Sequence, residues 1–218
     1  MRTASVLLAA GAVLAATLSA LPPREASAQR SPRAERGAQA AVAAEPLAVP
    51  LTLVDDRRFA DRVLAARSGE GSRGQSEGAL DLDPERGSFA PGGGGSVTVA
   101  FADNRLLSSG DGRADLLLLG QLGEVGVALR PADTETARFL QRAGRRADRL
   151  GFVELGRFVG PNVAVDLDAE LGARWYGHLR FDAVRLVDLW DGTAEHPFGP
   201  SDVDGVYAST SELLPEDM

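Results

Sequence analysis

The stretch that decides the fold is SVTVAFADNRLLSSGDGRADLLLLG, residues 96–120. Its first part alternates large apolar residues with small or polar ones, at Val97, Val99 and Phe101, which is the period of a half-buried strand. Polar turn residues follow, and four consecutive leucines at 116–119 are then typical of a short strand inside a sheet. The stretch therefore predicts a strand, a polar turn and a buried strand.

The same two-residue period recurs along most of the chain. Alternating or continuous apolar segments lie at 123–130, 151–155, 162–167, 178–189 and 202–208. Clusters of glycine, proline, asparagine and aspartate separate these segments, a spacing typical of an all-β sandwich or barrel. We therefore expect one all-β domain, a β-sandwich, over residues 55–210.

One segment has the spacing of a helix instead of a strand. In residues 134–150, TETARFLQRAGRRADRL, apolar side chains recur at helical intervals, and Asp133 or Thr134 can serve as N-cap. Gly144 weakens such a helix by about 1 kcal/mol relative to alanine. We expect one short inserted helix whose arginines form a solvated face, with an anionic partner as the alternative.

The two ends of the chain are expected to lie outside this domain. Residues 1–28 carry Arg2, an apolar stretch and the small residues Ala26-Ser27-Ala28, the pattern of a signal peptide cleaved near Ala28. Residues 29–54 predict a disordered linker, and 211–218 a tail. We therefore expect a secreted or periplasmic protein with no membrane span in the mature chain.

Composition limits the possible partners. The chain carries a formal net charge of −8 and no cysteine. This acidity argues against a nucleic-acid partner, which requires a clustered basic surface. It is compatible with divalent cations, although acidity also serves solubility alone. The lack of cysteine excludes a disulfide framework, so the core, or a core assisted by metal, must hold the fold.

Two acidic groups are candidates for a calcium site. They are Asp103, Asn104, Asp111 and Asp115 around the first polar turn, and Asp202 and Asp204 in the last predicted strand. Calcium takes six to eight hard oxygen ligands of this kind. The alternative is that these side chains only cap turns through hydrogen bonds to their own backbone.

A third acidic group, Asp166, Asp168 and Glu170, repeats the alternation of the last strand. Exposed strand faces show the same pattern, so we leave these residues out of the predicted metal site.

Both tryptophans lie in settings that suit carbohydrate binding. Trp190 stands between Asp188 and Asp191, and Trp175 is followed by Tyr176. An exposed indole can stack on a sugar ring while carboxylates accept the sugar hydroxyls. The alternative is that both rings are core anchors.

Signs of catalysis are few. Nucleophilic catalysis requires Ser, Cys or Thr beside a base, and the two histidines, His178 and His196, are far apart in the sequence with no zinc-like spacing. We therefore expect a protein that is not an enzyme. The less favoured alternative is a glycan-degrading enzyme that uses two of the aspartates.

Three stretches in this order resemble a known domain family. They are 59–104 (FADRV to AFADN), 103–119 (DNRLLSSGDGRADLLLL) and 184–208 (VRLVDLWDG to DVDGVYA). Together they are similar to a β-sandwich domain of secreted bacterial cell-surface proteins, found in sorted surface proteins and fused to peptidoglycan-associated outer-membrane domains. The resemblance implies a jelly-roll, galactose-binding-like fold and no particular activity. The helix expected in 134–150 departs from it, since those domains have a hairpin there.

We therefore predict a secreted, non-catalytic binding or envelope-associated β-sandwich module. Calcium is its candidate ion, and a cell-envelope glycan or protein is its candidate partner. The alternative is a structural protein-interaction domain that uses the 134–150 helix and has no small-molecule site.

Overall fold

The computed structural model describes residues 55–80, 87–173, 178–193 and 199–215. The predicted signal peptide and linker lie outside these residues, and so do Trp175, Tyr176 and His196.

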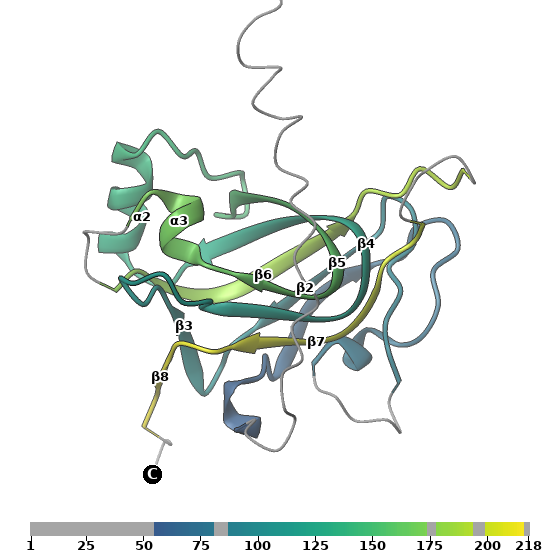
Figure 1. Cartoon of the computed structure of the whole chain (residues 1–218), viewed down its shortest axis with the longest axis horizontal. Coiled ribbons are helices and arrows are strands. Elements are labelled where there is room, and N and C mark those ends of the chain that lie inside the picture. The colour runs from purple at the N-terminus through teal and green to yellow at the C-terminus, as the bar shows by residue number, and fades with distance from the viewer. Residues whose placement is uncertain (1–54, 81–86, 174–177, 194–198, 216–218) are drawn as a thin grey trace, which may run out of the picture.

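Eight strands dominate the described part of the chain (Figure 1). They are β1 (Arg62–Arg67), β2 (Ser96–Ala100), β3 (Asn104–Leu107), β4 (Leu116–Pro131), β5 (Val153–Val165), β6 (Arg180–Asp188), β7 (Asp202–Ala208) and β8 (Ser211–Leu213). The helices are α2 (Thr134–Arg142), α3 (Leu167–Leu171) and two short 3-10 helices, Asp56–Arg58 and Ser76–Ala79. The prediction of a mostly β protein is confirmed.

The strands form one open antiparallel sheet organised around β4. One path through the sheet runs β1-β2-β6-β3-β8, and β4 pairs with β5, β6 and β7. The first part of β4, residues 116–121, pairs with β7, whereas residues 125–131 pair with β6. Strand β5 follows β4 along its other edge. This pairing does not confirm the specific jelly-roll sandwich that we predicted.

The strands predicted at 116–119 and 123–130 are joined in the single strand β4, and those predicted at 151–155 and 162–167 are joined in β5. A bend in the β4–β5 hairpin explains both differences. Gly120 has a φ of +120°, and a Cβ there would lie 2.2 Å from the carbonyl oxygen of Asp202. The Gly120 N–H donates to Oδ1 of Asn162 at 3.0 Å, and Asn162 itself has a φ of +47°. Because only glycine fits at position 120, the strand can change direction here without ending.

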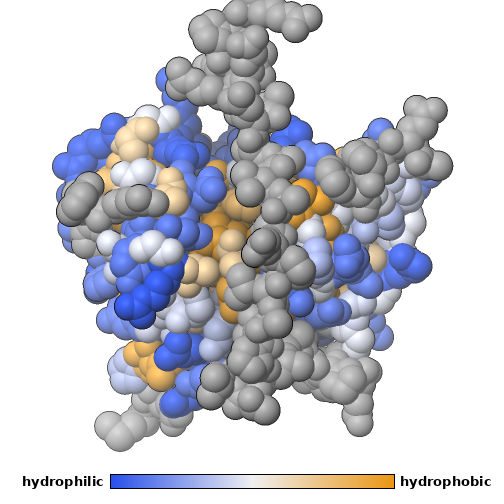
Figure 2. All heavy atoms as spheres, in the orientation of Figure 1, coloured by the Kyte–Doolittle hydropathy of each residue, from blue (hydrophilic) through white to orange (hydrophobic). Residues whose placement is uncertain are grey.

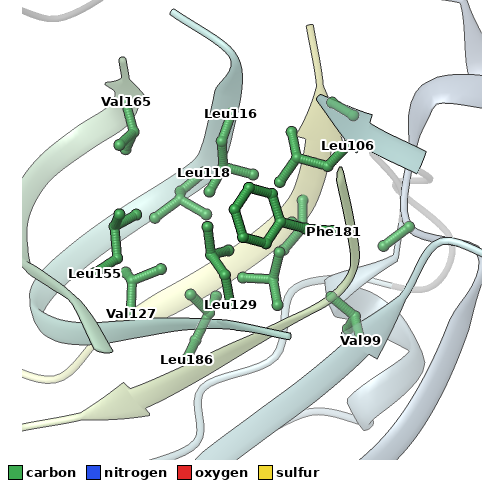
Figure 3. Packing of buried hydrophobic residues seen from close by; sticks show 14 of the residues in the cluster. Val99, Leu106, Leu116, Leu118, Val127, Leu129, Leu155, Val165, Phe181 and Leu186 are labelled. Carbon is green, nitrogen blue, oxygen red and sulfur yellow. The ribbon is translucent and has the colours of Figure 1, made fainter. Parts of the chain in front are cut away.

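The main core lies between the two halves of the bent hairpin. Leu116 and Leu118 come from the first half of β4, and Val127 and Leu129 come from the second half. Phe181 of β6 is fully buried in the same core, with Leu116 from one half and Leu129 from the other beside its ring (Figure 3). The bend therefore lets one strand supply two walls of the core.

Helix α2 is shorter than the sequence predicted. Asp133 is the N-cap and accepts a hydrogen bond from the Thr136 N–H at 2.7 Å, as expected. The helix ends at Arg142, and Gly144 follows with a φ of +77°. The prediction is confirmed for 134–142 and wrong for 143–150, because the glycine turns the chain out of the helix. None of the helices in the described part has the length and apolar character needed to span a bilayer.

Two further elements differ from the sequence prediction. Helix α3 begins after its N-cap Asp166 and ends before Gly172, where we expected the end of a strand. Strand β8 lies where we expected a tail, and it pairs with β3 at Asn104↔Leu213. Both elements are short, so tertiary contacts and not local propensity decide that they form.

The core predicts a strong effect of removing the central aromatic ring. We expect Phe181→Ala to lower the free energy of unfolding by about 3–5 kcal/mol, because it leaves a cavity among residues that cannot fully collapse. Leu213→Ala is the control, since this leucine of β8 is 41% exposed. Urea denaturation of both variants measures the difference. Equal losses would contradict the placement of the core.

Candidate metal centre

Asp115 lies directly before β4 and is fully buried. Its Oδ1 accepts a hydrogen bond from the Ser109 N–H at 2.9 Å, and its Oδ2 accepts one from the Leu167 N–H at 3.1 Å. Its backbone N–H donates to the Val165 carbonyl, and its carbonyl accepts from the Ser209 N–H, both at 2.8 Å. One aspartate therefore joins the polar turn, the start of α3 and the end of β7.

Helix α3 places two more carboxylates beside Asp115. Asp168 is fully buried, and its Oδ2 accepts hydrogen bonds from the Gly110 N–H at 2.6 Å and from Ser109 Oγ at 3.3 Å. Its Oδ1 is buried and has no hydrogen-bond partner among the residues that the structure describes. Asp166 is half-buried and caps the helix by accepting from the Ala169 N–H at 3.0 Å.

We call Asp115, Asp166 and Asp168 the Asp115 cluster. Each offers a carboxylate oxygen, and these oxygens lie within 4.8 Å of one another. Among the described residues, no arginine forms an ion pair with any of the three. Like charges at this separation repel one another, and a cation between them removes the repulsion. The cluster therefore has the ligand chemistry of a site for a hard divalent cation.

Burial changes the titration of the central carboxyl group. It raises the pKa of Asp115 above its ordinary value of 3.8, and the nearby charge of Asp168 raises it further. Hydrogen bonds from Ser109 and Leu167 act in the opposite direction. A group with a raised pKa is one that the fold holds as an anion only at a cost.

Asp111, which we predicted as a ligand, lies at the rim of the cluster. Its Oδ1 accepts hydrogen bonds from Ser109 Oγ and from the Arg113 N–H, both at 2.9 Å. Its Oδ2 forms an ion pair with Arg113 at 2.9 Å. The backbone N–H of Arg113 is the main reason why the pKa of Asp111 is lowered. Ser109 thus connects Asp111 to the cluster.

Asp103 and Asn104 lie elsewhere. Asn104 is buried and its side-chain amide donates to the Arg57 carbonyl. Asp103 is exposed and adjoins Asp61, whose carboxylate accepts the Asp103 N–H at 3.2 Å. Partial loss of hydration, and then the neighbouring Asp61 carboxyl group, raise the pKa of Asp103. These two predicted ligands are therefore not brought to Asp115.

Asp202 and Asp204 lie at the start of β7, far along the strand from Asp115. Asp202 pairs with Gln121, whereas Ala208 at the other end of β7 pairs with Leu116. Burial, and then the charge of Asp202, raises the pKa of Asp204. Because β4 and β7 are antiparallel along this length, the two acidic groups that we expected to meet lie at opposite ends of one strand.

The surroundings of Trp190 serve the local turn. The Asp188 carboxylate is fully buried and accepts the backbone N–H groups of Trp190 and Ser201, both at 3.0 Å. Asp191 Oδ1 accepts from the Thr193 N–H at 3.0 Å and the Thr193 hydroxyl at 2.7 Å. Trp190 is half-buried, and its indole N–H donates to the Thr193 carbonyl at 3.1 Å. The buried carboxylate of Asp188 does not face a ligand in solution.

The sequence did contain a signal for the two missed carboxylates. Asp166 followed by a short run to Gly172 is the pattern of an N-cap and a helix end. The preceding alternation of valines made residues 162–167 resemble a continuing strand. A helix of only five residues does not show a helical period.

Comparison with protein-family models, with curated proteins and with solved structures finds no match to this chain. The resemblance to envelope-associated β-sandwich domains therefore stays a prediction. Function has to be inferred from the geometry of the site.

The raised pKa of Asp115 predicts how a calcium response depends on pH. In EDTA, this group favours folding below the ordinary aspartate pKa of 3.8, and the contribution is lost as pH rises through the raised pKa. Calcium competes with the proton, so the rise in melting temperature on adding calcium should grow from pH about 4 to about 7. Thermal scans in calcium and in EDTA across this range measure it. A larger response at the acidic end would contradict the assignment.

Proposed function

We propose that this protein is a secreted, non-catalytic binding module whose β-sheet scaffold is stabilised by calcium bound at the Asp115 cluster. The observation that carries the proposal is the Oδ1 atom of Asp168, which is buried beside two other carboxylates and has no hydrogen-bond partner in the described part of the chain. A buried polar oxygen normally has a partner, since losing its hydration otherwise costs about 1–3 kcal/mol. A cation supplies that partner.

The ligand chemistry favours calcium over other common metals. The cluster offers oxygen donors, whereas zinc prefers histidine and cysteine. Of the two histidines, His178 is the nearer in sequence to the Asp115 cluster. Its Nδ1 already forms a hydrogen bond with the Ser108 carbonyl at 2.7 Å. Magnesium retains several waters in a strict octahedron, which suits a buried site poorly. Calcium accepts irregular sets of carboxylate and backbone oxygens.

A bound ion would stabilise the fold by joining separate segments. The polar turn at Ser109, the start of β4 and the start of α3 all contribute to the cluster or contact it. The chain has no cysteine, so no disulfide can provide this connection. Binding to the folded state alone stabilises it by about 2.7 kcal/mol when the free ion is at about 100 times its dissociation constant.

The ligand of the module is a separate question from its ion. Export, attachment to the cell envelope and recognition of a glycan through Trp190 or Trp175 stay proposals from the sequence. The carboxylates of Asp188 and Asp191 already accept hydrogen bonds from the protein, so they do not support carbohydrate binding. The remaining support for it is an indole face that could stack on a sugar ring.

Removal of one carboxylate tests the ion site. We expect saturating calcium to raise the melting temperature of the wild-type protein by about 5–10 °C relative to EDTA. Asp168→Asn should abolish this rise, because it removes one of the negative charges that attract the cation. Asp188→Asn is the matched control, since Asp188 is also fully buried but its hydrogen bonds within the described part of the chain come from backbone N–H groups.

The control variant should lose stability and still respond to calcium. Isothermal titration with calcium and with magnesium identifies the preferred ion. If EDTA leaves the wild-type melting temperature unchanged and calcium adds nothing, the proposed function is wrong.

A further inference from the structure

A second candidate site lies beside α2. A cleft of about 980 Å³ opens between α2, the end of β4 and the chain that follows the helix. Arg130, Arg145 and Arg146 line it together with apolar side chains that include Leu140 and Val153. No acidic residue is among the lining side chains that the structure describes. Figure 2 shows strongly hydrophilic atoms, with paler ones among them, over the end of the molecule that carries α2 and α3.

The charge of this region is opposite to that of the chain. Residues 134–153 contain five arginines and two acidic residues, while the whole chain has a formal net charge of −8. Arg130 is neutralised by Asp182 at 2.7 Å. Arg145 and Arg146 form no ion pair with any residue that the structure describes. The cleft therefore has an uncompensated positive charge at one wall.

Arg145 is held in place by the backbone. Its guanidinium donates to the Glu154 carbonyl at 3.2 Å and to the Glu170 carbonyl at the end of α3. These bonds use part of its donor set and fix the plane of the group. Arg146 beside it is exposed, and among the described residues no hydrogen bond uses its side chain. One arginine is thus preorganised and the other is free to close on a ligand.

The loop that carries both arginines is anchored on the sheet. Phe152 is buried on the outer face against Ala128 and lies under the guanidinium of Arg185, 4.6 Å from its ring centroid. Asp148 accepts the Phe152 N–H at 2.9 Å and forms an ion pair with Arg185 at 2.7 Å. The position of the cleft wall is therefore set by packing, and not by the short helix alone.

We propose that this arginine cleft binds an organic oxyanion, that is, a phosphate or carboxylate group on an apolar body. Guanidinium groups match the planar, bidentate geometry of such anions. Leu140, Val153 and their apolar neighbours accommodate the body of the ligand. The volume is within the range of about 300–1,000 Å³ that small-molecule sites occupy. The site uses none of the residues of the proposed calcium site.

A pair of arginine variants tests the cleft. Phenyl phosphate and benzoate are titrated calorimetrically into the full chain in EDTA, so that no cation contributes. We expect Arg146→Ala to weaken binding about tenfold, the loss of one charge-assisted contact. Arg149→Ala is the matched control, because Arg149 is exposed on the same loop and does not line the cleft. It should change the affinity by less than about twofold.

The arms of the experiment separate the possible outcomes. The tighter of phenyl phosphate and benzoate identifies the head group, and failure of both to bind overturns the proposal. Equal losses in Arg146→Ala and Arg149→Ala would show diffuse attraction and would overturn it too. Inorganic phosphate should bind more weakly than phenyl phosphate. Equal affinity would show that the apolar side chains of the cleft do not contribute to binding. Asp168→Asn should bind the anion as the wild type does, which keeps this test apart from that of the calcium site.

Discussion

The carboxylate of Asp115 is the interaction on which the organisation of the candidate metal centre depends. It is buried, yet it accepts N–H groups from Ser109 in the polar turn and from Leu167 at the start of α3. The backbone of the same residue bonds Val165 and Ser209. Burying a charge is costly unless hydrogen bonds or an opposite charge compensate it. The hydrogen bonds compensate Asp115 in part, and the adjacent Asp168 adds a second negative charge. The resulting excess of charge is the physical reason to expect a cation.

Helix α3 connects the two proposed sites. Asp166 and Asp168 lie at its beginning, and the Glu170 carbonyl near its end receives the guanidinium of Arg145. A helix of five residues is too short to be stable alone, so these contacts from both sides hold it. One short helix therefore contributes carboxylates to the Asp115 cluster and also contacts an arginine of the cleft.

Much of the sheet could be predicted from the sequence, but little of the Asp115 cluster or of the arginine cleft could be. Strand β7 has the predicted bounds, because its apolar residues are bounded by Pro200-Ser201 on one side and Ser209-Thr210 on the other. The bend at Gly120 could not be predicted, since a glycine between two apolar runs is equally typical of a turn. The grouping of Asp115 with Asp168 depends on antiparallel pairing between β4 and β5, residues that are distant in sequence. The expectation that Asp202 lies near Asp115 came from the order of the two acidic segments along the chain, and this order carries no information on strand direction.

The central position of β4 also determines when all strands of the sheet can pair. Its partners β5, β6 and β7 all follow it in the chain, and β7 ends only at Ala208. While the polypeptide is being synthesised, the edges of β4 must wait for segments that the ribosome has not yet released. Contacts between such distant residues make folding slow, and unpaired edges favour aggregation in the interval. A cell that makes this protein therefore has to protect one long apolar strand from the moment it emerges until β7 has been synthesised.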